Sequence, residues 1–299
     1  MQSKRQIGSR IGKKVRSLAN RAIASLSQLA SSLMGNAISG NANANGEDRM
    51  FPKGSAAPKE RCVSAPPPRS RYPLEYRWEK LPMREVRPAL RRRSASLSPG
   101  AEWHDTGPRD QPFDFSMAIA RLTEDIAKRS PYFAHLQTSR ILIGYVQART
   151  GEQHGLQARV TPLRFAGGDL VRLRRGMPYQ VQRYFEGERE FLYLMTFCLP
   201  RYLERDFDDK ITTLFHELYH IGPRFDGDLR RHEGRCHLHT HSKVGYDRTM
   251  AAYANEYLKQ HPDPALLGFL RMDFAQLKQR HGKVVAALVP RPRLVPSAG

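Results

Sequence analysis

The chain has 299 residues, of which 40% are hydrophobic, and it carries a formal net charge of +20 at pH 7. Its three cysteines are an odd and sparse set, which argues against a disulfide scaffold and favours a reducing, cytoplasmic setting. No run of about 18 apolar residues occurs, so the sequence predicts no transmembrane segment. The strong positive charge favours contact with anionic partners.

Residues 1–110 are rich in Arg, Ser, Pro, Ala and Asn and hold few apolar clusters. Such a segment cannot bury enough surface to offset its ordering entropy, so we expect this basic region to be largely disordered. It lacks any base-reading motif, so we expect only non-specific contact with nucleic acid or an anionic membrane. Within it, residues 7–34 repeat apolar side chains at a spacing typical of an amphipathic basic helix, and also of a transit peptide.

A single globular domain is expected over residues 111–282, a length that allows one real core. In chain order the sequence predicts a helix over 115–129 and strands over 140–148, 157–165, 170–174 and 191–199. The strand at 170–174 alternates Arg with apolar residues, which predicts a half-exposed strand with a basic outer face. The strand at 191–199 is the most apolar and leads into the next helix.

That next helix carries His216-Glu217-Leu218-Tyr219-His220, an HExxH motif in an apolar segment with helical periodicity. Asp206 is expected to cap the helix, and Gly222-Pro223 to end it. Because residues four apart share one helix face, the two imidazoles can bind one metal ion. Glu217 projects beside them and can take a proton from a water molecule, which is the arrangement of a zinc-dependent peptidase.

A peptidase zinc needs a third protein ligand and an open position, and the following segment offers several candidates. His232, twelve residues after His220, comes first because the turn from Gly222 to Gly227 lets the chain fold back. A histidine of the alternating run comes second, and a carboxylate third. The alternatives to His232 are His237, His239, His241, Asp226 and Glu256.

Helices are predicted near 247–260 and over 265–280, followed by a basic tail at 283–299. This order of elements predicts an α+β fold: a small zincin-like domain with a mixed or antiparallel sheet of three or four strands, the HExxH helix and C-terminal helices. In that fold an edge strand holds the substrate backbone by strand addition.

Two boxes of the sequence resemble the phage metallopeptidase domain family, a zincin-type group. The family joins a helix bearing His-Glu-Leu-x-His-Ile to a Leu-Arg-x-His-acidic box, and this chain has the first box at 216–221 and the second at 229–233. The resemblance implies that His216 and His220 are zinc ligands, that Glu217 is the catalytic base and that His232 is the third ligand. Glu233 replaces the family's Asp.

The leading hypothesis is a zinc metalloendopeptidase that hydrolyses peptide bonds of a peptide or protein substrate, with Zn²⁺ as cofactor and Glu217 as general base. Tyr246, Tyr253 or Arg235 could donate to the oxyanion. The alternative is a non-catalytic zinc protein that contacts nucleic acid or a protein partner through its basic N-terminal region. In that case a fourth ligand, such as Cys236 or His239, would close the metal site.

Overall fold

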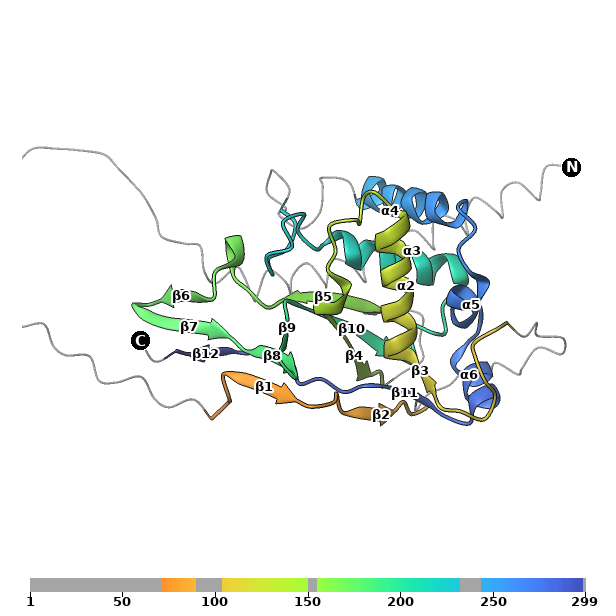
Figure 1. The fold of residues 1–299 in the computed structure, drawn as a ribbon, viewed down its shortest axis with the longest axis horizontal. Helices are drawn as coiled ribbons and strands as arrows, with labels where there is room; N and C mark the ends of the chain where they lie inside the picture. Colours follow the sequence, from red (N-terminus) through yellow and green to blue (C-terminus); the bar gives the residue numbers. More distant parts are fainter. Residues whose placement is uncertain (1–70, 90–103, 150–154, 232–242, 298–299) are drawn as a thin grey trace, which may run out of the picture. The chain divides into compact units, whose positions relative to one another are not determined.

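The computed structural model of the chain describes residues 71–89, 104–149, 155–231 and 243–297. This part contains five α-helices and four three-stranded sheets, so the predicted α+β class is confirmed (Figure 1). The helices are α2 (Phe115–Arg129), α3 (Phe207–Tyr219), α4 (Lys243–Leu258), α5 (Pro264–Leu267) and α6 (Phe274–His281). The strands are β1 (Glu75–Trp78), β2 (Met83–Glu85), β3 (Phe113–Asp114), β4 (Ile141–Gln147), β5 (Ala158–Pro162), β6 (Val171–Arg174), β7 (Met177–Val181), β8 (Arg183–Glu186), β9 (Arg189–Phe191), β10 (Tyr193–Leu199), β11 (Val284–Ala287) and β12 (Leu294–Pro296).

The sheet that positions the candidate site has the strand order β4-β10-β5. Strand β10 lies in the middle, parallel to β4 and antiparallel to β5, and all of its residues except Thr196 are buried. Alternate side chains of β10 enter two different cores because successive residues of a strand point to opposite faces. Tyr193, Met195 and Phe197 belong to the larger core, whereas Leu194 belongs to a smaller one.

The helices gather on one face of this sheet. The buried stripes of α2 and α3 enter the same core as Tyr193 and Met195, and α3 also contacts β5 and α4. Helices on one face of a small sheet give the α+β arrangement. In the part of the chain that the structure describes, no helix is long and apolar enough to cross a membrane.

Helix α3 follows its sequence signals closely. Asp206 occupies the N-cap position, although its side chain makes no capping hydrogen bond, and Asp208 and Asp209 lie in the first turn near the positive end of the helix dipole. The helix ends at His220, and the chain turns at Gly222. Its apolar residues face the core together with Lys210 and Glu217, the two buried ionisable side chains of the helix.

The fold extends on both sides of the range 111–282. Strand β1 pairs in parallel with β8, and β2 pairs with β11, which also pairs with β3. Near the C-terminus, β12 pairs with β7. The sequence therefore undercounts the strands, since it predicts one sheet of three or four. The segment 7–34 and the rest of residues 1–70 lie outside the described residues.

Most predicted elements are found within two residues of their expected bounds, although β5 ends three residues before the expected end and α4 begins four residues before the expected start. Two other predictions are wrong in detail. The helix expected over 265–280 is split into α5 and α6, because Asp273 forms a capping box with Gln276 and starts a new helix. The strand expected over 170–174 to be half-exposed is exposed along its whole length in β6.

Candidate metal centre

The two histidines of the HExxH motif lie next to each other at the C-terminal end of α3. Their ring centroids are 4.7 Å apart, with an interplanar angle of 74°. Two imidazoles on one zinc ion, with Zn–N bonds of about 2.1 Å, have centroids roughly 5 Å apart. The observed separation of His216 and His220 therefore fits one shared divalent cation, as the i, i+4 spacing predicts.

Helix α4 supplies two residues that surround these rings. The Tyr246 ring lies edge-on to His216 at 4.9 Å and stacks on His220 at 6.0 Å between centroids. An oxygen of Asp247 lies 3.8 Å from Nδ1 of His216. A carboxylate near one ring nitrogen orients a histidine and leaves the other nitrogen for a metal. Sequence reasoning missed Asp247, because no spacing rule relates it to His216.

Glu217 points from α3 toward the edge strand β5. Its side chain is buried, and Oε2 accepts a hydrogen bond of 2.7 Å from the backbone N–H of Val160. Burial raises the pKa of Glu217 to about 7, although the Val160 hydrogen bond and the charge of Arg159 lower it. A divalent cation on the neighbouring imidazoles would lower this pKa again. The carboxyl group is thus held at one oxygen by the sheet.

After His220 the chain folds back on itself. Ile221 and Leu229 form an antiparallel bridge, and the N–H of Arg230 donates to the carbonyl of His220 at 2.7 Å. We call residues 221–231 the return loop. Its effect is to bring the backbone of Arg230 against the residue that ends α3.

The side chain of Arg230 clamps the return loop to α3. Its Nε donates to the carbonyl of Tyr219 at 2.8 Å, and its guanidinium lies 4.1 Å from the centre of the Tyr219 ring. A cation at a helix C-terminus satisfies a carbonyl that has no partner within the helix and complements the helix dipole. Arg230 therefore fixes the end of the helix that carries both histidines.

The return loop also rests on the sheet. The hydroxyl of Tyr193 on β10 donates to the carbonyl of Asp228 and accepts from the N–H of Gly227, at 2.8 and 3.0 Å. Gly227 has φ +88, and a Cβ there would overlap the side chain of Arg164, so only glycine fits without rearrangement. These contacts hold the return loop against the sheet.

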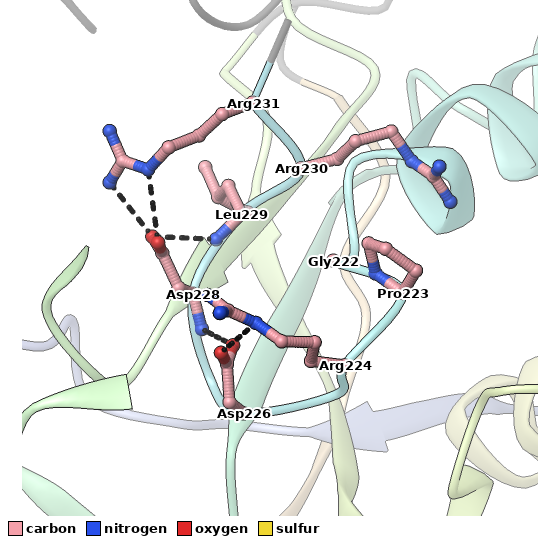
Figure 2. A pocket seen from close by; sticks show the side chains of 8 residues that line it. All are labelled: Gly222, Pro223, Arg224, Asp226, Asp228, Leu229, Arg230 and Arg231. Atoms are coloured by element: carbon pink, nitrogen blue, oxygen red, sulfur yellow. Dashed lines mark hydrogen bonds and ion pairs between the residues drawn. The ribbon is translucent and has the colours of Figure 1, made fainter. Parts of the chain in front are cut away.

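A hollow of about 250 Å³ lies within the return loop, and four of the charged residues that line it form two ion pairs (Figure 2). Arg231 donates from two nitrogens to the buried carboxylate of Asp228, each at 3.0 Å. Arg224 pairs with Asp226 at 3.0 Å, and Asp226 also accepts from the N–H of Asp228. These paired charges stabilise the shape of the return loop.

The candidates for the third ligand fall in different places. The carboxylate of Asp226 is bound to Arg224, and Glu256 is exposed on α4. His232, His237, His239 and His241, together with Arg235 and Cys236, lie outside the described residues. Among the residues that the structure does describe, no three His, Cys, Asp or Glu side chains form a group that could hold a metal.

Of the tyrosines expected as oxyanion donors, Tyr246 lies against both imidazoles, whereas Tyr253 stacks on Tyr132 with centroids 4.0 Å apart. The Tyr219 ring contacts both Tyr246 and Tyr253. Burial raises the pKa of Tyr246, so its phenol keeps its proton at neutral pH. Tyr246 is therefore the tyrosine best placed to donate a hydrogen bond beside the two histidines.

Comparison with known proteins agrees with the resemblance of the two boxes. No curated protein and no solved structure matches the chain. The family model described as "Putative phage metallopeptidase" matches residues 116–253. The match runs from α2 into α4 and contains both histidines, Glu217 and the return loop. Over residues 116–253, the chain is therefore similar to the Putative phage metallopeptidase family.

Proposed function

We propose that this domain is a zinc-dependent peptidase that hydrolyses internal peptide bonds. The observation that carries the proposal is the pair of imidazoles at the end of α3, 4.7 Å apart, with the carboxyl group of Glu217 between them in sequence. Two imidazoles suit zinc, and one carboxyl group beside them suits proton transfer. The match of residues 116–253 to the family model supports a peptidase.

His216, His220 and His232 are the proposed zinc ligands. Arg230 donates its N–H to the carbonyl of His220, and His232 follows it by two residues, a span of at most about 7 Å. The return loop therefore supports His232 over a ligand farther along the chain. Asp226 is a weaker candidate because Arg224 neutralises it, and Glu256 is weaker because it faces solvent.

Zinc at this site would act as a Lewis acid that polarises the scissile carbonyl and lowers the pKa of a water molecule toward 7. Glu217 is the proposed general base. The N–H of Val160 holds Oε2, which leaves Oε1 to accept the proton of the attacking water and to pass it to the leaving amine. Fixing one oxygen orients the carboxyl group and removes part of the entropic cost of the transfer.

Two residues of α4 complete the proposed site. Asp247, whose carboxylate lies 3.8 Å from Nδ1 of His216, is the proposed group that orients this imidazole, which would leave Nε2 to bind the zinc. Tyr246 donates a hydrogen bond from its hydroxyl group to the oxygen that develops negative charge in the transition state. The contacts of Tyr246 with both imidazole rings support this role.

The test is the Glu217→Gln variant of the full-length protein, with Glu188→Gln as the matched control on an exposed position. The amide oxygen of the substituted side chain can still accept from Val160, so the fold and the metal site are expected to persist. In Glu217→Gln, we expect the zinc content to be unchanged and the cleavage of an unstructured protein such as casein to fall by at least about 100-fold. The control variant should keep both. Retained cleavage in Glu217→Gln would refute the assignment of the base.

A cobalt-substituted sample distinguishes the proposed peptidase from a closed structural zinc site. Three imidazole ligands and a water give no thiolate-to-cobalt charge-transfer band. A strong band of that kind would indicate that Cys236 joins the site, and it would argue for a non-catalytic zinc protein.

A further inference from the structure

Strands β6 and β7 form a hairpin that the proposed peptidase site does not use. Figure 1 shows β6, β7 and β12 side by side, and β6 forms the outer edge of this sheet. Every residue of β6 is exposed, and the exposed fraction of Leu173 is 70%. We call residues 171–181 the hairpin arm.

One face and the tip of the hairpin arm are cationic. Arg172 pairs across the strands with Tyr179, and Arg174 with Met177, so both arginines lie on the same face. Arg175 lies in the turn. Residues 170–182 contain no Asp or Glu, and none of the three arginines forms an ion pair with any residue that the structure describes.

The turn places an arginine where glycine or asparagine is favoured. Two residues, Arg175 and Gly176, connect the strands, and both have positive φ, 52 and 76 respectively. Two-residue turns with two positive φ angles prefer Asn-Gly. A bulky side chain in this backbone conformation costs free energy, and such residues are concentrated at functional positions. The unfavourable conformation of Arg175 therefore indicates that an arginine at the tip has a function.

We propose that the hairpin arm binds the phosphate backbone of duplex DNA through Arg172, Arg174 and Arg175. Beyond Pro178, where β12 no longer pairs with β7, the tip of the hairpin arm is a two-stranded β-ribbon, which is narrow enough to enter the major groove. Side chains two residues apart on one face of a strand are separated by about 7 Å, which is close to the separation of successive phosphates along one DNA strand. The guanidinium group, which all three side chains share, binds phosphate oxygens through two parallel hydrogen bonds.

The arrangement of the hairpin arm favours DNA over an anionic membrane. A hairpin that inserts into a membrane interface buries apolar side chains deepest. Here the tip is Arg175-Gly176, and the exposed Leu173 lies on the face opposite Arg172 and Arg174. If the tip inserted into a membrane, the charged Arg175 would enter the apolar interior before Leu173 does, which is unfavourable.

The test compares two full-length variants that lose the same charge. The first is Arg172→Gln/Arg174→Gln/Arg175→Asn, where Asn suits the positive φ of the turn and keeps the hairpin arm folded. The control is Arg121→Gln/Lys259→Gln/Lys283→Gln, which neutralises three exposed cations elsewhere in the described domain. Binding to a labelled duplex DNA is measured by fluorescence anisotropy over a series of salt concentrations. Both variants keep residues 1–70, so any contribution from that region cancels.

In the hairpin variant, the loss of three phosphate contacts should reduce the magnitude of the slope of log affinity against log salt by about 2.7. This corresponds to a Kd increase of about 500-fold at roughly 0.1 M salt. The slope of the control variant should differ from the wild-type slope by less than about 0.9, the contribution of one phosphate contact. Equal losses in both variants, or no loss in either, would overturn the proposal. So would a hairpin variant that keeps its DNA affinity but no longer binds vesicles containing phosphatidylserine, because the partner would then be a membrane.

Discussion

Lys210, on the helix that carries the HExxH motif, is a buried lysine whose charge should control stability at alkaline pH. Its side chain is 2% exposed, and Nζ donates to the carbonyl of Met272 at 2.8 Å. Burial lowers the pKa of Lys210 from 10.5 to about 8, and the charges of Asp273, Glu204 and Asp206 offset only part of this effect. Replacement by methionine removes the charge and keeps most of the volume of the side chain.

The size and sign of the effect follow from the two pKa values, 10.5 in the unfolded chain and about 8 in the folded one. The difference of 2.5 units corresponds to about 3 kcal/mol, because each unit is about 1.4 kcal/mol. Below pH 8 Lys210 is protonated in both the folded and the unfolded chain, so burial of its charge destabilises the folded state by the full amount. Between pH 8 and 10.5 the folded state binds fewer protons, so the free energy of unfolding rises with pH.

The assay is urea unfolding of the wild type, Lys210→Met and Lys259→Met at pH 8 and at pH 10.5. Lys259 is exposed and serves as the matched control. Tyrosines that titrate in this range are common to all three proteins and cancel in the comparison. Between the two pH values, the wild type and Lys259→Met should gain about 3 kcal/mol relative to Lys210→Met. The same pH dependence in all three would show that Lys210 is not desolvated in the folded state.

Two further predictions concern residues that hold the metal centre in shape. Asp247→Asn should weaken zinc binding by about 10- to 100-fold, measured by competition with a chelator, because the carboxylate no longer orients His216; an unchanged affinity would exclude that role. Arg230→Met should lower the free energy of unfolding by about 2 kcal/mol, since it removes both the hydrogen bond to Tyr219 and the cation over its ring, and Arg230→Lys should recover part of this loss. Equal unfolding midpoints for wild type and Arg230→Met in urea would contradict the clamp.

The helices and the most apolar strands could be predicted from the sequence because their signals are local. The stripe of α2 and the capped, apolar pattern of α3 give the observed elements almost residue for residue. The short strands β1 and β2 are not predicted because they lie within the basic region that is expected to be disordered. Strand β1 does carry a local signal, since Leu74, Tyr76 and Trp78 alternate with charged residues. The partners of the two strands, β8 and β11, lie more than 100 residues away in the sequence, so only the tertiary structure identifies these partners.

The same contrast holds at the candidate site. The proximity of His216 and His220 follows from the helical repeat, and the structure confirms it. The hydrogen bond from Val160 to Glu217 and the contact of Asp247 with His216 depend on how β5 and α4 pack against α3. No sequence spacing encodes these distances. His232 stays a prediction that the return loop supports.

The measurement that tests the central claim most directly is the zinc content of purified full-length protein, determined by mass spectrometry of the metal. We predict about one zinc per chain in the wild type and in Glu217→Gln, and almost none in His220→Ala. A zinc site with three protein ligands loses most of its affinity when one of the three imidazoles is removed. A folded His220→Ala protein that keeps its zinc, or a wild type that binds none from a zinc-containing buffer, would contradict the account.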